Sequence, residues 1–311
     1  MLLNTAFPLR YIFQRLRPDV GRVLLISVSF HLLKLALGPY LPLIPLQLPT
    51  ILGSLISLLL AFKTSQSYDR WWEARKIWGT IVNDSRTLVL QMRTFVADEQ
   101  PVATADGEAA AAPPESPLHT VARRQIAWCY ALGESLRGLD PTATLRRYLR
   151  GPELAYVLPQ TNRPLALLAL HTAQLRSLYQ QQALHPMQQL QLDATLVRLA
   201  DAMGQAERIK TTVFPVSYRL LVHAFIYLFL LTLSLGLVKT IGLWEIPVLL
   251  VTASSFFLLE RTARYLQDPF HNKPTDTPVT ALARTVEINL MQLLQQPDVP
   301  AELAPAAFYV M

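Results

Sequence analysis

Four ionisable residues lie inside long apolar stretches of this sequence, and they are the first candidates for chemistry. His31 and Lys34 interrupt one apolar run, and Arg219 and His223 interrupt a second. An ionisable side chain at membrane depth must face a cavity or a partner, because an isolated charge in hydrocarbon is costly. We therefore treat all four as functional candidates. For Arg219, near the end of its run, extension of the side chain to the membrane surface is an equally good explanation.

No catalytic or metal-binding motif accompanies these residues. The sequence contains no GxxxxGK[ST], GxGxxG, HExxH or GxSxG pattern, and its six histidines are scattered. The single cysteine, Cys129, excludes CxxC sites and an intrachain disulfide, and its apolar helical surroundings predict a buried structural thiol. We expect no enzymatic activity, no metal site and no cofactor.

The composition is that of a membrane protein. Of 311 residues, 51% are hydrophobic and only 16% are charged, against roughly 25% charged residues in soluble domains. The apolar excess is concentrated at 23–62 and 214–259, around a polar middle from 63 to 212. The net charge of +6 arises mainly at the ends of the apolar blocks, where topology signals belong. We expect no nucleic-acid partner, because no basic patch adjoins stacking aromatic residues.

Each apolar block has the length of two membrane-spanning helices. A spanning helix needs about 20 residues, and Gly38 with several prolines interrupts the first block near its middle. The sequence therefore predicts helices at about 20–38 and 48–70. It predicts two more at about 215–237 and 242–265.

The charges that flank these helices predict their orientation. Arginines precede the first helix, basic residues follow the second and fourth, and Lys210 precedes the third. By the positive-inside rule, both termini and the polar middle are cytoplasmic. A cleaved signal peptide is the alternative for residues 1–38, but His31 and Lys34 within its apolar region favour a retained helix.

The polar middle is predicted to be helical, because no alternating strand pattern of useful length appears. Residues 98–117 are rich in Ala, Pro and acidic residues and are predicted to form a disordered loop. The predicted helices are 68–96, 118–136, 141–150, 164–183 and 186–209. The predicted divisions are a cytoplasmic N-terminal segment (1–19), a first membrane pair (20–70), a cytoplasmic helical domain (71–213), a second membrane pair (214–265) and a cytoplasmic C-terminal segment (266–311).

One segment stands out where the second helix would leave the membrane. It reads SYDRWWEAR at residues 67–75, followed by Trp78-Gly79 and Asn83-Asp84-Ser85-Arg86. Paired tryptophans beside charged residues suit an interfacial belt. They also suit cation–π and ion-pair packing between subunits. Helical periodicity does not distinguish the interfacial belt from packing between subunits.

This segment closely resembles the bestrophin family in its bacterial branch. Phe214-Pro215-Val216-Ser217-Tyr218 and Asp268-Pro269-Phe270 match in the expected order. The resemblance implies an all-α, homopentameric ion channel of the bacterial inner (plasma) membrane, with four transmembrane helices per subunit and one central pore. Its implied partners are copies of itself, membrane lipid and small inorganic ions. The structural motif residues are Arg70, Trp71, Trp72, Glu73, Arg75, Pro215, Asp268, Pro269 and Phe270.

The resemblance also assigns pore residues. It places a narrow neck at Ser54, Leu58 and Phe62, whose spacing by four puts them on one helix face. Ser54 replaces a bulkier apolar residue and should make one end of the neck wider and wetter. A second, cytoplasmic aperture maps to Met187. The alternative for Leu58 and Phe62 is ordinary packing against helices or lipid.

The region after the fourth helix departs from the calcium-binding members of the family. Residues 267–276 hold two acids and a lysine, whereas Ca²⁺ takes six to eight oxygen ligands. We therefore expect no calcium gating by this route, and expect Asp268 and Phe270 to pack and cap structure near a subunit contact.

Two other functions remain open, a secondary transporter and a membrane-anchored scaffold. The first would show internal repeats and helices broken at the midplane, and no convincing repeat is present. The choice between cation and anion selectivity also stays open, because the three neck residues are uncharged.

Overall fold

The structure is a computed structural model that describes residues 9–37, 40, 44–96, 116–212, 215–237, 241–304 and 309. Its regular elements within these ranges are helices, which confirms the predicted all-α class. The elements are α1 (Leu9–Leu37), α2 (Gln47–Phe95), α3 (Pro117–Leu136), α4 (Thr142–Tyr148), α5 (Gly151–Val157), α6 (Arg163–Gln180), α7 (Pro186–Thr211), α8 (Val216–Gly236), the 3₁₀ turn η2 (Gly242–Trp244), α9 (Glu245–Gln267) and α10 (Val279–Leu293).

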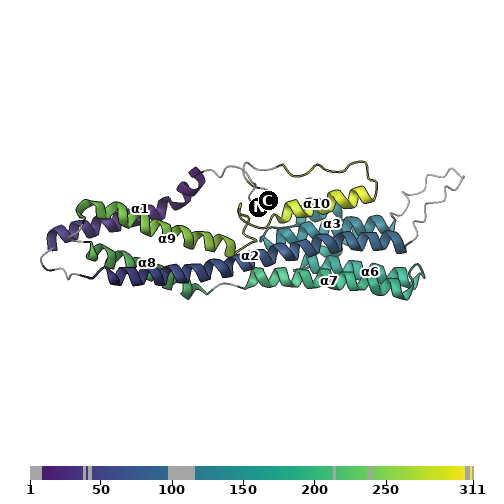
Figure 1. Cartoon of the computed structure of the whole chain (residues 1–311). Helices are drawn as coiled ribbons and strands as arrows, with labels where there is room; N and C mark the ends of the chain where they lie inside the picture. Colours follow the sequence, from purple (N-terminus) through teal and green to yellow (C-terminus); the bar gives the residue numbers. More distant parts are fainter. Residues whose placement is uncertain are drawn as a thin grey trace. The chain divides into compact units, whose positions relative to one another are not determined.

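The chain divides into two compact units, and each is described by itself. The membrane unit lies within Leu3–Trp72 and Thr212–Pro269, and the bundle unit within Glu73–Thr211 and Phe270–Met311. Helix α2 contributes its first part to the membrane unit and its second part to the bundle unit (Figure 1).

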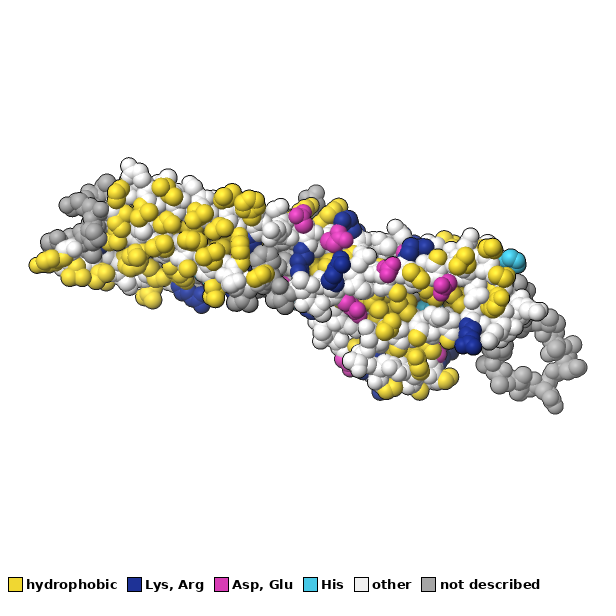
Figure 2. Space-filling view, turned by 90° about the horizontal axis from the view of Figure 1, so that it is seen from below, with side chains coloured by type: hydrophobic (Ala, Val, Ile, Leu, Met, Phe, Trp, Pro, Cys, Tyr) yellow, Lys and Arg dark blue, Asp and Glu magenta, His cyan; other side chains and the backbone are white. Residues whose placement is uncertain are grey.

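The membrane unit contains α1, the first part of α2, α8 and α9, which run alongside one another (Figure 1). Each of the four is long and apolar enough to cross a membrane, which confirms the four predicted passes. Side chains from all four form a shared apolar cluster that includes Val23, Ile56, Ile226 and Phe257. The visible outer face of this unit is mostly hydrophobic (Figure 2), as expected for helices whose solvent is hydrocarbon.

Helices α1 and α9 run antiparallel, and an ion pair joins them near each end of their contact. Arg261 Nη2 lies 2.6 Å from Asp19 Oδ2. Farther along both helices, the Lys34 ammonium donates to the Glu245 carboxylate. Fifteen residues of α1 separate the two pairs, a distance of about 22 Å at 1.5 Å per residue.

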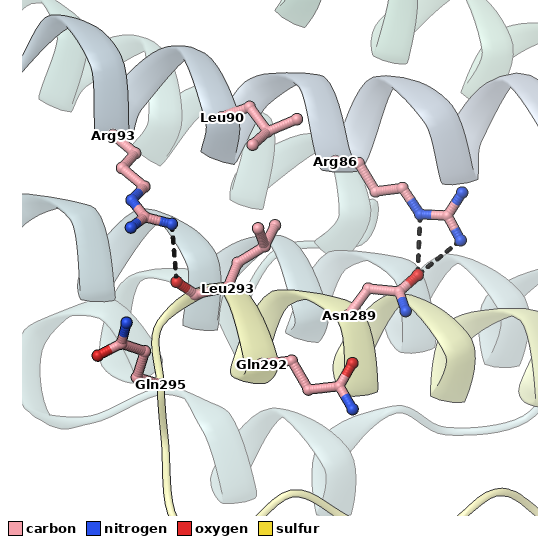
Figure 3. Close-up of a pocket in the computed structure, with 7 residues that line it drawn as sticks. All are labelled: Arg86, Leu90, Arg93, Asn289, Gln292, Leu293 and Gln295. Carbon is pink, nitrogen blue, oxygen red and sulfur yellow. Dashed lines mark hydrogen bonds between the residues drawn. The ribbon is translucent and has the colours of Figure 1, made fainter.

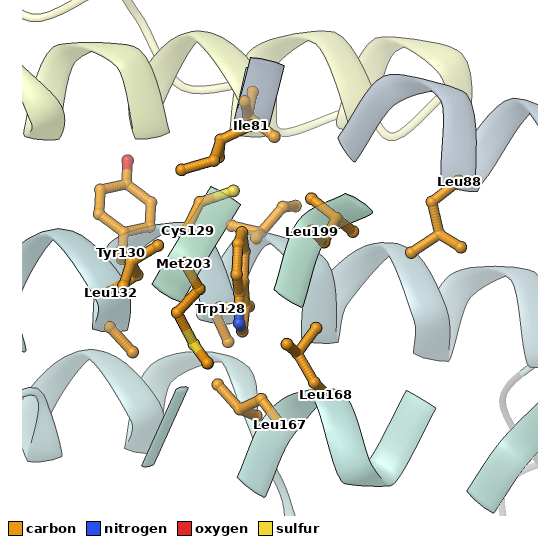
Figure 4. Close-up of a cluster of buried hydrophobic side chains, with 14 of the residues drawn as sticks. Ile81, Leu88, Trp128, Cys129, Tyr130, Leu132, Leu167, Leu168, Leu199 and Met203 are labelled. Carbon is orange, nitrogen blue, oxygen red and sulfur yellow. The ribbon is translucent and has the colours of Figure 1, made fainter. Parts of the chain in front are cut away.

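The bundle unit packs the second part of α2 with α3, α6, α7 and α10 around an apolar core. Trp78 and Trp128 are fully buried in it. Leu167, Leu199 and Met203 lie around the Trp128 ring (Figure 4). Helix α3 contacts α4, α6, α7 and α10, and 14 of its 20 residues are buried, Arg124 and Gln125 among them. It is therefore the central helix of this unit.

The helix boundaries differ from the predicted ones at several places. Helix α1 begins at Leu9 rather than near residue 20. It continues through Pro18, although this proline removes one backbone hydrogen bond of the helix. The predicted helices 48–70 and 68–96 are one continuous helix. The predicted helix 141–150 corresponds to α4. Helix α5, which follows after the extended residues Leu149 and Arg150, was not predicted. Helix α10 was not predicted.

Part of the predicted disordered loop, 98–115, lies outside the described residues, while Pro117 is the first residue of α3. Gly38, Pro39 and Pro42 of the predicted turn also lie outside them. Pro49 lies inside the first turn of α2, where a helix tolerates a missing backbone N–H.

Candidate functional site

The membrane part of α2 has two opposite faces. One face carries Ile56, Leu60, Lys63 and Ser67, all of them 2% exposed or less. Their spacing of four, three and four residues defines one stripe on a helix. This stripe packs into the membrane unit against α8 and α9.

The other face of α2 carries the three predicted neck residues. Leu58 is 54% exposed, Phe62 is 59% exposed, and Ser54 is also exposed. The Ser54 hydroxyl donates to the Thr50 carbonyl 3.0 Å away, so it is held against its own helix. The helices that the structure describes therefore leave this face uncovered. One such helix cannot enclose a lumen, whereas several copies arranged around an axis can.

A buried ion pair holds α2 to α9. Lys63 Nζ lies 2.9 Å from Glu260 Oε1, and both side chains are 2% exposed. The second carboxylate oxygen of Glu260 accepts from Arg264 of the same helix. It also lies 3.7 Å from His223 Nε2 of α8. Basic side chains from three helices therefore lie around the Glu260 carboxylate. A carboxylate buried among apolar side chains is stable only when it is paired in this way.

A second polar contact to α2 comes from α8. The Tyr218 hydroxyl donates to the Leu59 carbonyl, 2.8 Å away. Sequence reasoning singled out Tyr218 as part of a motif but gave it no role, and it passed over Lys63 and Glu260 as a pair. Their positions inside the predicted spanning helices 48–70 and 242–265 were the available signal, although only the fold could join residues that lie 197 positions apart.

The other ionisable candidates have different surroundings. Lys34 donates to Glu245 and to the Ser234 carbonyl, and His31 Nδ1 lies 3.9 Å from Glu245 Oε2. Both carboxylates of α9 are thus matched by lysines of other helices. Arg219 is exposed near the start of α8.

The aromatic and charged motif of α2 forms a patch at the end of the membrane unit. Arg70 Nη2 donates to the Thr212 carbonyl at 2.6 Å. The ring centroids of Trp71 and Trp72 lie 6.4 Å apart, and Trp72 is 47% exposed. In the bundle unit, Glu73 pairs with Lys76 on the surface at 2.6 Å, and the Arg75 side chain lies beside Gly79.

Two further predicted residues lie at helix starts. Met187 is the second residue of α7 and is 66% exposed. Pro215 immediately precedes α8, whereas Phe214 of the same motif lies outside the described residues.

The segment after α9 folds as a tight turn. Asp268 occupies the C-cap position of α9, with Pro269 after it. Phe270 is 1% exposed and belongs to the bundle core, as predicted for a packing residue. Asp276 Oδ2 accepts from the backbone N–H groups of His271 and Lys273, so this acid closes the turn.

Across the described ranges, no group of three or more His, Cys, Asp or Glu residues could hold a metal ion.

The bundle unit contains one buried carboxylate that is held by hydroxyl groups. Glu287 is 1% exposed and accepts from Tyr130 and Tyr148, each at 2.6 Å. Burial, and then the hydrogen bond to Glu287, raise the pKa of both tyrosines. Arg147 and Arg284 balance the charge at 3.4 and 3.3 Å.

Two other titratable groups of the bundle are buried. Cys129 is buried against Ser85, which confirms the predicted burial of this thiol. Burial raises the pKa of Cys129 to about 12. His171 is 2% exposed, and neither ring nitrogen has a hydrogen-bond partner among the described residues. Burial, and then the positive charge of Arg124, lower the pKa of His171 well below its usual value. At neutral pH, His171 is therefore neutral and Cys129 is protonated, and we assign both a structural role.

A shallow pocket of about 540 Å³ lies between α2 and α10 in the bundle unit (Figure 3). Its two arginines already donate to neighbouring oxygens, Arg86 to the Asn289 side chain and Arg93 to the Leu293 carbonyl. Its other lining residues are Leu90, Gln292 and Gln295. The pocket contains no nucleophile or general base, and none of the predicted site residues.

These features define a class of protein: a helical integral membrane protein with four spans. One of its helices presents an uncharged stripe on a face that the other described helices leave uncovered. The chain belongs to the bacterial and fungal bestrophin family, whose model matches residues 5–292.

Known relatives agree with this assignment. A voltage-dependent anion channel-forming protein of Ralstonia nicotianae is 28% identical over 83% of this chain and 80% of its own length. The voltage-dependent anion channel-forming protein YneE of Escherichia coli K12 is 26% identical over 99% of this chain and 90% of its own. A crystal structure of a bacterial bestrophin homologue from Klebsiella pneumoniae matches with a TM-score of 0.77 and 28% identity, covering 92% of this chain and all of that one. The family and these relatives are channels rather than enzymes.

Proposed function

We propose that this protein is a homo-oligomeric ion channel that conducts small monovalent ions through a central pore. The pore neck is formed by Ser54, Leu58 and Phe62 of α2. The observation that carries the proposal is the uncovered, uncharged face of α2, opposite a face that is buried and anchored by Lys63. Rings of such side chains exclude ions by size and by the cost of dehydration, and gate by dewetting.

We propose a homopentamer, in which five copies of α2 surround the pore. Lipid covers the apolar outer surface of the four spans, where residues such as Leu35 and Val251 are exposed. The basic residues that flank the spans support an inner-membrane location with both termini and the bundle unit in the cytoplasm. Met187, exposed at the start of α7, forms a second aperture in this arrangement.

The relatives' names favour anions as the conducted species. The neck itself supplies no charge to select a sign, because its three side chains are neutral. The reversal potential of purified protein in a planar bilayer under a salt gradient measures this selectivity directly. A potential near the chloride equilibrium value supports anion conduction, and one near the cation value overturns it.

The pore assignment is tested by variants that widen the neck. We expect Phe62→Ala and Leu58→Ala to raise salt flux through proteoliposomes, because each removes a bulky apolar ring of side chains. Leu35→Ala is the matched control, since Leu35 is 71% exposed on α1 and lies outside the proposed pore. Flux no greater than that of empty liposomes, from an oligomer verified to be folded, would overturn the channel itself. Equal flux from all variants would overturn the assignment of the neck.

A further inference from the structure

We infer that the buried Lys63–Glu260 ion pair is a positioning device that fixes the rotation of α2 and so holds the Phe62 ring toward the pore. The inference rests on the proposed function, because it takes Phe62 as a neck residue. It assigns roles to two residues that lie outside the neck and contact no permeating ion.

Lys63 directly follows Phe62 on α2. Successive side chains of a helix point about 100° apart, so fixing the direction of one fixes the direction of the other. Lys63 points into the membrane unit, where its ammonium lies 2.9 Å from Glu260. Phe62, which is 59% exposed, therefore points away from the chain's own helices.

The ion pair defines a single rotation more sharply than the apolar contacts beside it. Ile56 and Leu60 belong to the apolar cluster shared with α8 and α9, and apolar contacts of this kind are non-directional. A buried ammonium is different, because leaving it unpaired costs several kcal/mol. Rotation of α2 by one residue's angle would carry Lys63 away from the carboxylate and incur this penalty.

The acceptor is itself held in place. Arg264, one turn farther along α9, donates to the Glu260 carboxylate, and His223 of α8 lies 3.7 Å from it. Tyr218 of α8 also donates to the Leu59 carbonyl, four residues before Lys63. The part of α2 that bears Phe62 is thus held by polar contacts to both α8 and α9.

The consequence has a definite sign. A side chain that points at a lumen leaves it when its helix rotates in either direction. Loss of the Lys63 charge should therefore raise unitary conductance toward the value of Phe62→Ala. In the Phe62→Ala background the same loss should add little, because no ring remains to be positioned.

The experiment compares unitary conductance in planar bilayers for purified Phe62→Ala, Lys63→Met, Lys63→Arg and the Phe62→Ala/Lys63→Met double variant. We expect Lys63→Met to move most of the way to Phe62→Ala, and Lys63→Arg to retain the wild-type value. Lys34→Met is the matched control, because Lys34 forms the other buried pair with α9 from α1. It should lower thermal stability as Lys63→Met does and leave conductance unchanged.

A double variant separates positioning from mere stabilisation. Removing both charges, as in Lys63→Met/Glu260→Gln, relieves the unpaired ammonium and should recover much of the thermal stability lost in Lys63→Met. Conductance should remain raised, because no ion pair fixes the rotation. Recovery of wild-type conductance together with stability would overturn the inference. This variant also serves as the test if Lys63→Met does not fold.

The remaining outcomes tell the two hypotheses apart. If Phe62→Ala changes conductance but Lys63→Met does not, the inference fails and the proposed neck stands. If Lys63→Met raises conductance by the same factor with and without Phe62, Lys63 acts by another route and the inference fails. If Phe62→Ala leaves conductance unchanged in a folded oligomer, the proposed neck fails first.

Discussion

The membrane unit and the bundle unit differ in the groups that surround their buried carboxylates. In the membrane unit, Glu245 and Glu260 are each matched by a lysine ammonium from another helix. In the bundle unit, Glu287 accepts hydrogen bonds from two tyrosine hydroxyls in addition to its pairing with two arginines. The two units also differ in where their apolar side chains lie. The membrane unit exposes many of them (Figure 2), and the bundle unit buries most of its own in a core.

The solvent of each unit explains the difference. Helices in hydrocarbon gain little from burying apolar side chains against one another, so polar contacts and close packing hold them together. Helices in water are held by removal of apolar surface from the solvent. The contrast predicts that the membrane unit depends most on its ion pairs, and that the bundle unit depends most on its core.

The largest effect is expected from Glu245→Gln. It leaves the Lys34 ammonium buried with the Ser234 carbonyl but without its counter-charge. Removing one partner of a buried pair costs about 3–5 kcal/mol. Thermal unfolding in detergent measures the loss. Glu73→Gln is the matched control, because Glu73 pairs with Lys76 on the surface, where such pairs contribute about 0–1 kcal/mol. Equal losses from the two variants would contradict the comparison.

In the bundle unit we expect a comparable effect from a purely apolar change. Leu132→Ala removes a side chain that is 1% exposed and leaves a cavity, at a cost of about 2–5 kcal/mol in cores of this kind. Leu139→Ala serves as the control, because Leu139 is 48% exposed. Denaturant unfolding measures this cost, followed by tryptophan fluorescence, to which the buried Trp78 and Trp128 of this unit contribute. A cost for Leu132→Ala no larger than for Leu139→Ala would rule out a core-dependent bundle.

A smaller loss is expected from Tyr148→Phe. The substitution removes one of the two hydroxyls that donate to Glu287, and hydrogen bonds to charged groups contribute about 1.5–3 kcal/mol. Tyr179→Phe is the control, since Tyr179 is 43% exposed. The same unfolding measurement applies. A neutral effect of Tyr148→Phe would mean that the arginines near Glu287 satisfy it without the hydroxyls.

The smallest effect is a dependence of stability on pH. The pKa of His171 is lower in the folded protein than in the unfolded chain, so below about pH 6.5 the unfolded chain binds a proton that the folded protein does not. Stability should therefore fall as pH decreases from about 6.5, by up to ~1.4 kcal/mol per pH unit from this group. His171→Leu should remove that part of the slope between pH 6.5 and 5. An unchanged slope would show that His171 is not the responsible group.

Long, strongly patterned elements were predictable from the sequence. The four spans follow from apolar runs of sufficient length, and α3, α6 and α7 follow from helical periodicity with small errors at their ends. Helices α5 and α10 were missed. Short helices carry weak periodicity, and tertiary packing rather than intrinsic preference decides whether they form.

The sequence by itself determined that this chain crosses a membrane with helices, because hydropathy is a property of consecutive residues. It also placed Ser54, Leu58 and Phe62 on one helix face, because a spacing of four is a local property. Only the tertiary structure decided that this face is uncovered and that Lys63, beside it, reaches Glu260. That pairing joins two charges 197 residues apart, and it depends on how α2 and α9 pack.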